Sequence, residues 1–385
     1  MKSLFRSMTL LLALALGACA SAPPMPPAGD LFHDELFVAP TAPIEPAAAL
    51  AISPAMRSYL AVKLVNRTRS TERRRLLIDA LYRGDLKLEY DAEMTRTAAQ
   101  AFDARSGNCL ALVLMTAAFA KELGLKVHYQ AVIGDEAWDR SDDLYIGVGH
   151  VNLVLEERAE PVGFFSTTAG SMVIDFLPPR DAKLLRTREI GEATVIAMYL
   201  NNRAVESLTR GRVNDAYWYA REAVNTDRDL VGAYVTLGVV YRMQRRPDLS
   251  EAVLRRVADR EPDNLYAMSN RVLALRDLGR GAEAEALMSR LAQLDPHPAF
   301  SYFREGMAAY TQGRYDVARR LFAKEVDRAP YHHEFEYWLA VTYIQLGDAE
   351  RATVHLARAM EVSTTRKDHD LYAGKLDRLK ALRSQ

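Results

Sequence analysis

Cysteine is scarce in this chain of 385 residues, which contains only Cys19 and Cys109. Two cysteines cannot form the dense disulfide framework of a small secreted scaffold. The sequence also contains no His-x-x-x-His spacing and no paired cysteines of the kind that bind structural zinc. We therefore expect neither a metal ion nor a cofactor.

An excess of one charge is also missing, because 50 basic residues balance 50 acidic ones. A nucleic-acid-binding domain normally shows a clustered basic excess. A protein held on anionic lipids by charge alone needs a similar basic cluster. The balance argues against nucleic acid as a partner and against purely electrostatic attachment to a membrane.

Long hydrophobic runs are absent, and the apolar stretch at residues 8–16 is too short to span a bilayer. It follows Lys2 and Arg6, as the apolar core of a signal peptide follows its positive region. Residues 16–19, Leu-Gly-Ala-Cys, resemble the lipobox of bacterial lipoproteins. The resemblance implies a signal peptide over 1–19 and a lipid anchor on Cys19. The alternative is a plain secretory signal in which Cys19 is incidental.

The residue after Cys19 is Ala20, where an Asp typically retains lipoproteins in the inner membrane. The lipobox resemblance therefore implies a protein of the cell envelope. In a Gram-negative cell it would be an outer-membrane lipoprotein that faces the periplasm.

Residues 20–54 are rich in proline and alanine, and seven of the 16 prolines of the chain lie between residues 20 and 50. A segment with so little aliphatic density is expected to bury too little surface to fold. We therefore predict a disordered, extended tether that holds the folded part away from the membrane.

The C-terminal half repeats itself every 34 residues. Small residues, glycines and prolines recur on this period: Ala216, Ser250, Ala284, Ala318 and Ala352; Gly211, Gly279, Gly313 and Gly347, with Arg245 in the missing turn; and Pro262, Pro296 and Pro330. The pattern resembles the tetratricopeptide repeat, in which each unit is a pair of antiparallel helices that must stack on its neighbours.

The resemblance implies an all-α solenoid of five units over 197–366, at 197–230, 231–264, 265–298, 299–332 and 333–366, stacked as a right-handed superhelix. Each glycine position should form the turn between two helices. A capping helix should follow at 367–385. The concave face of such an array commonly binds a protein or peptide, which is the partner we expect.

Residues 55–190 follow a different pattern. Helices are predicted at 56–67, 72–83, 96–105 and 109–123, followed by strands at 126–133, 147–156 and 172–177. Helices followed by antiparallel strands are typical of an α+β domain.

Cys109 is the candidate nucleophile of this domain. It follows a Ser-Gly-Asn turn and begins an apolar helix, and a helix N-terminus favours the reactive thiolate. His150 lies in a Gly-His-Val-Asn strand and Asp175 in an Ile-Asp-Phe strand. Neighbouring strands lie about 5 Å apart, which permits a hydrogen bond between the imidazole and the carboxylate. Cys109 should remain partly accessible to solvent.

The segments around Cys109, His150 and Asp175, in this order, resemble the transglutaminase-like core, a papain-related superfamily that includes cysteine peptidases and cross-linking enzymes. The resemblance covers roughly residues 60–180 and assigns these three residues as the catalytic triad. Many members have an aromatic residue where this chain has Asn152. We expect Asn152 and Asn108 to line the site, and Gln100 to assist an oxyanion hole together with the Cys109 backbone N–H.

Other assignments remain open. His128 is a rival base, and Asp142 and Asp143 are rival carboxylates in a polar loop. A lone cysteine on an apolar helix is often a core residue, so Cys109 has a purely structural alternative as well.

The sequence as a whole predicts an exported, membrane-anchored thiol acyl-transfer enzyme with a peptide-binding repeat array. Water as acceptor would make it a cysteine peptidase or amidase, and an amine would make it a transglutaminase-like enzyme. The alternative is a non-catalytic envelope scaffold that uses the repeats for protein–protein interaction.

Overall fold

The computed structural model describes residues 24–63, 70–82, 86, 88–92, 94–133, 137–141, 144–148, 150–156, 171–176, 186–330 and 332–383. The predicted signal peptide at 1–19, the lipidation site Cys19, and Asp142 and Asp143 lie outside these residues.

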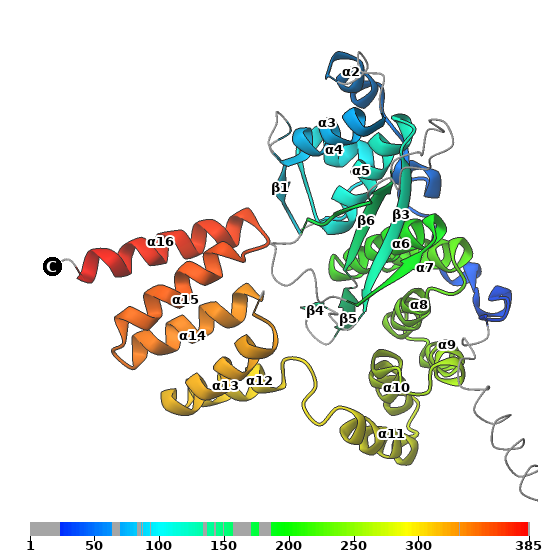
Figure 1. The fold of residues 1–385 in the computed structure, drawn as a ribbon. Helices are drawn as coiled ribbons and strands as arrows, with labels where there is room; N and C mark the ends of the chain where they lie inside the picture. The colour runs from blue at the N-terminus through cyan, green and yellow to red at the C-terminus, as the bar shows by residue number, and fades with distance from the viewer. Residues whose placement is uncertain are drawn as a thin grey trace, which may run out of the picture.

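The region before the repeats contains both helices and strands (Figure 1). Its helices are α2 (Pro54–Lys63), α3 (Ser70–Tyr82), α4 (Ala98–Ala104) and α5 (Cys109–Glu122). A four-stranded antiparallel sheet has the order β7-β6-β3-β8, formed by β7 (Met172–Ile174), β6 (Val151–Glu156), β3 (Lys126–Ile133) and β8 (Arg186–Ile190). Two smaller pairs are β1 (Glu89–Tyr90) with β2 (Ser106–Gly107), and β4 (Ala137–Ser141) with β5 (Leu144–Val148).

Helix α5 is the central helix of this region. Every residue from Cys109 to Ala120 is buried, as expected of a helix that is apolar on all sides. It packs against β6 and β3 of the sheet and against α4. The helix is followed by Gly124, whose φ of +70° is readily adopted only by glycine.

The C-terminal region consists of five helical hairpins and a final helix, with no strand among the described residues of 197–366. The hairpins are α6 (Glu192–Thr209) with α7 (Val213–Thr226), α8 (Val231–Met243) with α9 (Pro247–Arg260), α10 (Leu265–Asp277) with α11 (Gly281–Leu294), α12 (Ser301–Thr311) with α13 (Tyr315–Arg328), and α14 (His333–Gln345) with α15 (Ala349–Glu361). Helix α16 (Arg366–Arg383) follows.

The five hairpin turns lie where the 34-residue period predicts them. Gly211, Gly279, Gly313 and Gly347 have φ values between +71° and +77°, and Arg245 has a φ of +59° at the remaining turn. The left-handed conformation lets the backbone N–H groups after the first helix reach its last carbonyls. The turn prediction is therefore confirmed, including the turn that lacks glycine.

The arginine turn allows a test of backbone strain. We expect Arg245→Gly to stabilise the protein by up to about 1 kcal/mol. The left-handed conformation costs a non-glycine residue about 1–2 kcal/mol, which glycine avoids. Glycine offsets part of this gain, because it gives the unfolded chain more conformational freedom. Urea denaturation measures the change. Gly313→Ala is the matched control and should destabilise, because nothing lies within 4 Å of an added Cβ and only φ is strained. Equal unfolding midpoints for all three proteins would contradict this account.

The repeats do not form one uninterrupted stack, which corrects the expectation of five continuously stacked units. No extensive contact joins α11 to α12 in the described residues. The apolar core of α12–α16 is separate from the core that α6–α10 share with the α/β region. The connecting segment contains Pro296 and Pro298, and α12 begins at Ser301. Proline alone does not explain the break, because Pro262 and Pro330 lie in connections whose flanking helices do pack. The connection at 295–300 is longer than those at 261–264 and 329–332, and it ends at Phe300, which has a φ of +62°.

The imidazole ring of His332 is partly buried and joins the fourth and fifth hairpins. Its ring stacks on Phe335 at a centroid distance of 4.1 Å and meets Phe300 edge-on at 5.3 Å. Burial, with a smaller contribution from His333, lowers the pKa of His332 to about 3. The unfolded chain therefore binds a proton at mildly acidic pH that the folded protein does not.

This site predicts acid sensitivity. The neutral His332 ring contributes fully to the free energy of unfolding above about pH 6.5. This contribution is lost as the pH falls toward 3, because the unfolded chain then binds a proton at His332 and the folded protein does not. Between pH 7 and 4.5, the urea midpoint of His332→Phe should therefore fall less than that of the wild type. His369→Gln, at an exposed position on α16, should follow the wild type. Parallel declines of the His332 variant and the wild type would refute the prediction.

The N-terminal segment contradicts the tether prediction from residue 24 onward. Residues 24–50 contain three short helices, η1 (Gly29–Leu31), η2 (Asp34–Leu36) and η3 (Pro46–Leu50). Phe37 stacks on Tyr217 of α7 at 3.8 Å between ring centroids, and the backbone N–H of Thr41 donates to Asp215 Oδ1 at 2.8 Å. A few spaced apolar residues and captured backbone donors therefore dock the segment onto the repeats.

Candidate functional site

The sheet register brings His150 and Asp175 together. Strands β6 and β7 are antiparallel, with Leu153 opposite Ile174. His150 immediately precedes β6 and Asp175 immediately follows β7, so both lie at the same end of the strand pair. Asn152 lies two residues after His150, and alternate residues of a strand point to the same face.

The hydrogen bonds agree with this register. His150 Nε2 lies 2.9 Å from Asp175 Oδ1 and 3.0 Å from Oδ2, so the imidazole and the carboxylate form the hydrogen bond that the strand spacing permits. Asn152 Nδ2 donates to Asp175 Oδ2 at 3.4 Å. His150 and Asn152 are buried, whereas the Asp175 side chain is 18% exposed. The carboxylate is thus held by two neighbours.

Cys109 meets this pair from the start of α5. Its side chain is hydrogen-bonded to His150, and because Nε2 is taken by Asp175, Nδ1 is the ring nitrogen left for the thiol. Gly107 permits the tight turn before the helix, because an added Cβ would lie 2.8 Å from Ala111 Cβ. The structure therefore brings together the three residues that the sequence singled out as a triad.

The environment of His150 favours its protonated form. Burial lowers the pKa of His150, but hydrogen bonds with Asp175 and Cys109 outweigh it and raise the pKa to about 9. At neutral pH the ring therefore carries a proton, and a positive ring stabilises a neighbouring thiolate.

Tyr90 is a neighbour that the sequence analysis missed. Its hydroxyl is hydrogen-bonded to both the backbone and the side chain of Cys109, and burial raises the pKa of Tyr90 well above its ordinary value. Cys109 itself is only 8% exposed, so the expectation of an accessible thiol is wrong for this conformation. Tyr90 lies on the two-residue strand β1, where no local motif marks it.

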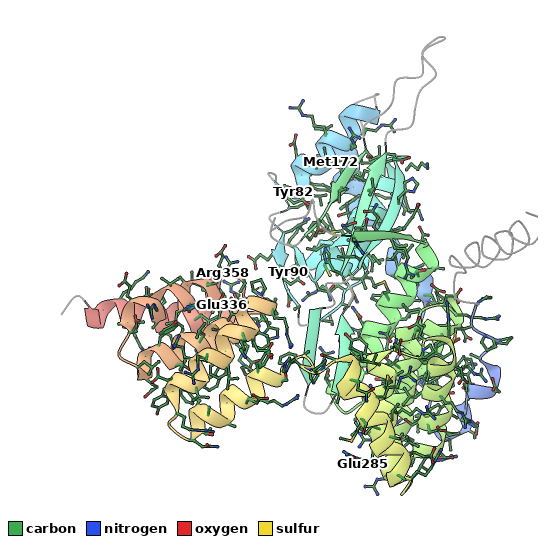
Figure 2. All side chains as sticks on the ribbon, turned by 60° about the horizontal axis from the view of Figure 1, so that its bottom comes forward. Tyr82, Tyr90, Met172, Glu285, Glu336 and Arg358 are labelled. Atoms are coloured by element: carbon green, nitrogen blue, oxygen red, sulfur yellow. The ribbon has the colours of Figure 1, made fainter. Side chains whose placement is uncertain are left out.

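The end of the repeat array lies next to this strand. The backbone N–H of Ala92, two residues after Tyr90, donates to the carbonyl of Thr364 at 3.0 Å. Figure 2 shows Tyr90 on the side of the α/β region that faces Glu336 and Arg358 of α14 and α15.

Two of the expected site residues have structural roles instead. Gln100 is exposed, and its Oε1 accepts from Thr97 N at 3.1 Å in a capping box at the start of α4. Asn108 adjoins Cys109, but its Oδ1 accepts from Ala111 N at 2.9 Å as the N-cap of α5. Both residue types are strong capping residues, and the helix starts compete for their side chains.

The rival base His128 is paired elsewhere. Its Nδ1 lies 2.7 Å from Glu189 Oε1 and its Nε2 lies 3.3 Å from Glu156 Oε2. In the sheet it is opposite Val154, away from the strand end that holds His150.

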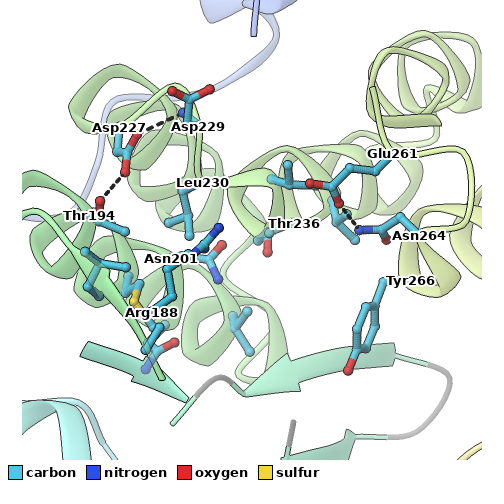
Figure 3. Close-up of a pocket in the computed structure, with 18 of the residues that line it drawn as sticks. Arg188, Thr194, Asn201, Asp227, Asp229, Leu230, Thr236, Glu261, Asn264 and Tyr266 are labelled. Atoms are coloured by element: carbon cyan, nitrogen blue, oxygen red, sulfur yellow. Dashed lines mark hydrogen bonds between the residues drawn. The ribbon is translucent and has the colours of Figure 1, made fainter. Parts of the chain in front are cut away.

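A second candidate site is a cavity of about 600 Å³ on the first repeats (Figure 3). Its walls come mainly from α6 and α8, from β8 and from the loops before α8 and α10, and α10 itself contributes Tyr266. The lining includes Met198, Asn201, Asn202, Val235, Val239 and Tyr266. Two of the lining residues form an ion pair, with Arg260 Nη1 2.7 Å from Asp229 Oδ1.

No group of His, Cys, Asp or Glu side chains in the described part of the chain is arranged to hold a metal ion. Likewise, none of the helices among those residues is long and apolar enough to cross a membrane.

Comparisons with known proteins bear on the repeats. Residues 235–297 and 303–361 match the tetratricopeptide repeat family. The unmatched residues between them coincide with the break between α11 and α12. No curated protein matches the chain.

Three solved structures illustrate the similarity. YrrB, described as a tetratricopeptide repeat protein with an unusual peptide-binding site, is 22% identical over 47% of this chain and 92% of its own, with a TM-score of 0.25. MamA from AMB-1 is 24% identical over 43% and 97%, with a TM-score of 0.24. MamA from Desulfovibrio magneticus RS-1 is 18% identical over 45% and 96%, with a TM-score of 0.26. The family match and the helical hairpins together make the C-terminal region of this chain a helical array of tetratricopeptide repeats.

Proposed function

We propose that the chain binds an extended segment of a partner protein in the cavity lined mainly by α6, α8 and β8. The observation that carries this proposal is a cavity of about 600 Å³ lined by the first helices of the first two repeats, α6 and α8, and by β8. A cavity of this size accommodates a few peptide side chains. The family match supports a role in protein–protein interaction for this region.

The chemistry of the walls suits a peptide. Val235 and Val239 supply apolar surface, and Asn201 and Asn202 supply amides. Asn201 Oδ1 is buried and has no hydrogen-bond partner among the described residues. A backbone N–H of a bound peptide would satisfy this acceptor, and leaving it unpaired costs about 1–3 kcal/mol.

Peptide binding tests the proposal. A displayed library of random peptides is selected against the full chain, and the affinity of a selected peptide is measured by fluorescence polarisation. Asn201→Arg places a long cation in the cavity and should weaken binding at least about tenfold, the equivalent of 1.4 kcal/mol. Ser289→Arg, on the exposed surface of α11, adds the same charge outside the cavity and should bind like the wild type. Failure to select any saturable peptide, or equal affinities for both variants, would overturn the proposal.

The second candidate function is thiol-dependent acyl transfer in the α/β region. The observation that favours it is His150, which is hydrogen-bonded to Asp175 through Nε2 and to Cys109. The similarity of the surrounding segments to the transglutaminase-like core agrees with this arrangement. We propose that Asn152 and Asp175 hold the ring, because a fixed ring keeps its other nitrogen aimed at the thiol.

In this proposal, the Cys109 thiolate attacks the acyl carbon of an amide and forms a carbon–sulfur bond. The protonated His150 gives its proton to the leaving amine as the carbon–nitrogen bond breaks. Water, or a second amine, then attacks the thioester, gives its proton to His150 and releases the thiolate. Hydrolysis is the default, because water is present unless the site excludes it. The Tyr90 hydroxyl must leave the Cys109 N–H before a substrate oxygen can accept from it.

We also propose export to the cell envelope as a lipoprotein anchored at Cys19. Met25 is buried and its backbone N–H donates to Asp229 at 3.2 Å, so such an anchor would hold the first repeats close to the bilayer. Membrane fractionation of Cys19→Ala tests the anchor. Release of the variant into the soluble fraction supports it, and retention with the membrane refutes it.

A further inference from the structure

The first repeat and the thiol site meet at Thr95, a buried residue between β1 and α4. Its backbone N–H donates to Glu206 Oε1 at 2.6 Å. Its Oγ1 accepts from Asn108 Nδ2 at 2.8 Å and from Asn202 Nδ2 at 3.3 Å. Asn202 and Glu206 lie four residues apart on α6, and such residues share one helix face. One buried hydroxyl therefore joins the first repeat helix to the residue before Cys109.

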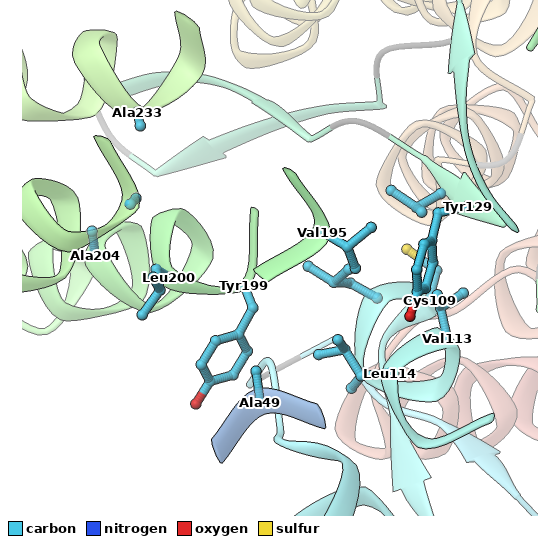
Figure 4. Close-up of a cluster of buried hydrophobic side chains, with 14 of the residues drawn as sticks. Ala49, Cys109, Val113, Leu114, Tyr129, Val195, Tyr199, Leu200, Ala204 and Ala233 are labelled. Carbon is cyan, nitrogen blue, oxygen red and sulfur yellow. The ribbon is translucent and has the colours of Figure 1, made fainter. Parts of the chain in front are cut away.

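The contact between Thr95 and α6 is polar, although apolar packing already holds α5 against α6. Helices α5 and α6 already share an apolar core, in which Val195 lies near Val113 and Leu114 (Figure 4). Glu206 is nevertheless largely buried, with Arg203 Nη1 2.9 Å from its Oε2. Burial raises the pKa of Glu206 against the opposing hydrogen bonds from Thr95. Buried polar networks specify one geometry rather than add much stability.

The geometry that this network specifies is that of Asn108. The Asn108 side chain is held at both ends, because Oδ1 accepts from Ala111 N at 2.9 Å while Nδ2 donates to Thr95. Asn108 is the N-cap of α5, and its orientation sets the backbone that leads directly into Cys109. A shift of the Asn108 amide therefore moves the thiol relative to His150.

We infer that Thr95 is a positioning residue through which the first tetratricopeptide repeat sets the geometry of the Cys109 thiol. Asn202 and Glu206 hold Thr95, and Thr95 holds Asn108. This inference rests on the proposed thiol site, and it makes the repeat array a structural part of that site. A displacement of about 1 Å at a reacting group lowers rates by up to about a hundredfold.

The reactivity of Cys109 measures this positioning. In the full chain with Cys19→Ser, Cys109 is the only thiol, and its second-order rate of alkylation by iodoacetamide is measured from pH 5 to 10. Mass spectrometry confirms the alkylated residue. Thr95→Val keeps the size of the side chain and its backbone N–H but removes Oγ1. It should slow alkylation at pH 7 about tenfold and move the pH profile upward, whereas Thr95→Ser should restore both.

Asn202→Ala tests the repeat side of the network without a change in the buried threonine. It should also slow alkylation, whereas Asn225→Ala, which removes an exposed amide on α7, should leave the rate unchanged. Circular dichroism establishes that each variant is folded. If His150→Ala is alkylated more slowly than the wild type, but folded Thr95→Val keeps the wild-type rate and pH profile, the inference about Thr95 is overturned and the thiol proposal stands. A wild-type thiol no more reactive than that of the urea-unfolded chain would overturn the thiol proposal and the inference with it.

Discussion

Replacing His150 with alanine is expected to slow alkylation of Cys109 at pH 6.5 about a hundredfold. An ordinary thiol has a pKa of about 8.5, so only about 1% of it is thiolate at that pH. In the wild type the pKa of His150 is raised to about 9 despite burial, because Asp175 and Cys109 are hydrogen-bonded to the ring. The ring therefore stays positive across the neutral range and supports the thiolate beside it.

The pH dependence has a definite sign. The proton on His150 stabilises the folded state fully below about pH 6.5, the ordinary pKa of histidine, and this contribution is lost as pH rises through about 9. The rates of the wild type and of His150→Ala should therefore converge above pH 9. Stopped-flow alkylation in the Cys19→Ser background measures both profiles.

Two control variants separate this effect from general damage. His128→Ala removes another imidazole of the sheet, which is paired with Glu189 and Glu156 and has no role at Cys109, and should alkylate like the wild type. Cys109→Ala should not be alkylated at all. If His150→Ala and the wild type react at equal rates at pH 6.5, Cys109 is a core cysteine and the acyl-transfer proposal fails.

Phe37→Ala is expected to release the N-terminal segment from the repeats and to destabilise the protein by about 3 kcal/mol. Phe37 is buried, and its ring lies parallel to that of Tyr217 at 3.8 Å. Truncation of a buried phenylalanine typically costs about 3–5 kcal/mol, and a segment at the chain end relaxes more easily than an internal one. The loss is therefore expected at the lower end of this range.

Limited proteolysis and urea denaturation measure the two consequences. In the wild type, the docked segment should resist cleavage between residues 24 and 50, and in Phe37→Ala it should be cut at rates typical of an extended chain. Val38→Ala is the matched control, because the adjacent Val38 is 71% exposed. Rapid cleavage of the wild type would show that the segment is a tether after all.

Much of the repeat architecture could be predicted from local patterns in the sequence. A hairpin turn needs one residue in the left-handed conformation, so the 34-residue period located all five turns, including the one formed by Arg245. Strand alternation placed His150 and Asn152 on one face. These properties depend on neighbours in the chain, and a sequence displays such neighbours directly.

Contacts between distant segments were decided only by the tertiary structure. Thr95 is hydrogen-bonded to Glu206, which lies 111 positions away, and Phe37 of the N-terminal segment stacks on Tyr217 of the first repeat. Tyr90 reaches Cys109 because β1 pairs with β2, a two-residue contact that leaves no periodic signal. The proline-rich segment looked unable to fold because composition measures only the surface that a segment can bury on itself. Its few apolar side chains instead bury against a surface that exists only after the repeats have stacked.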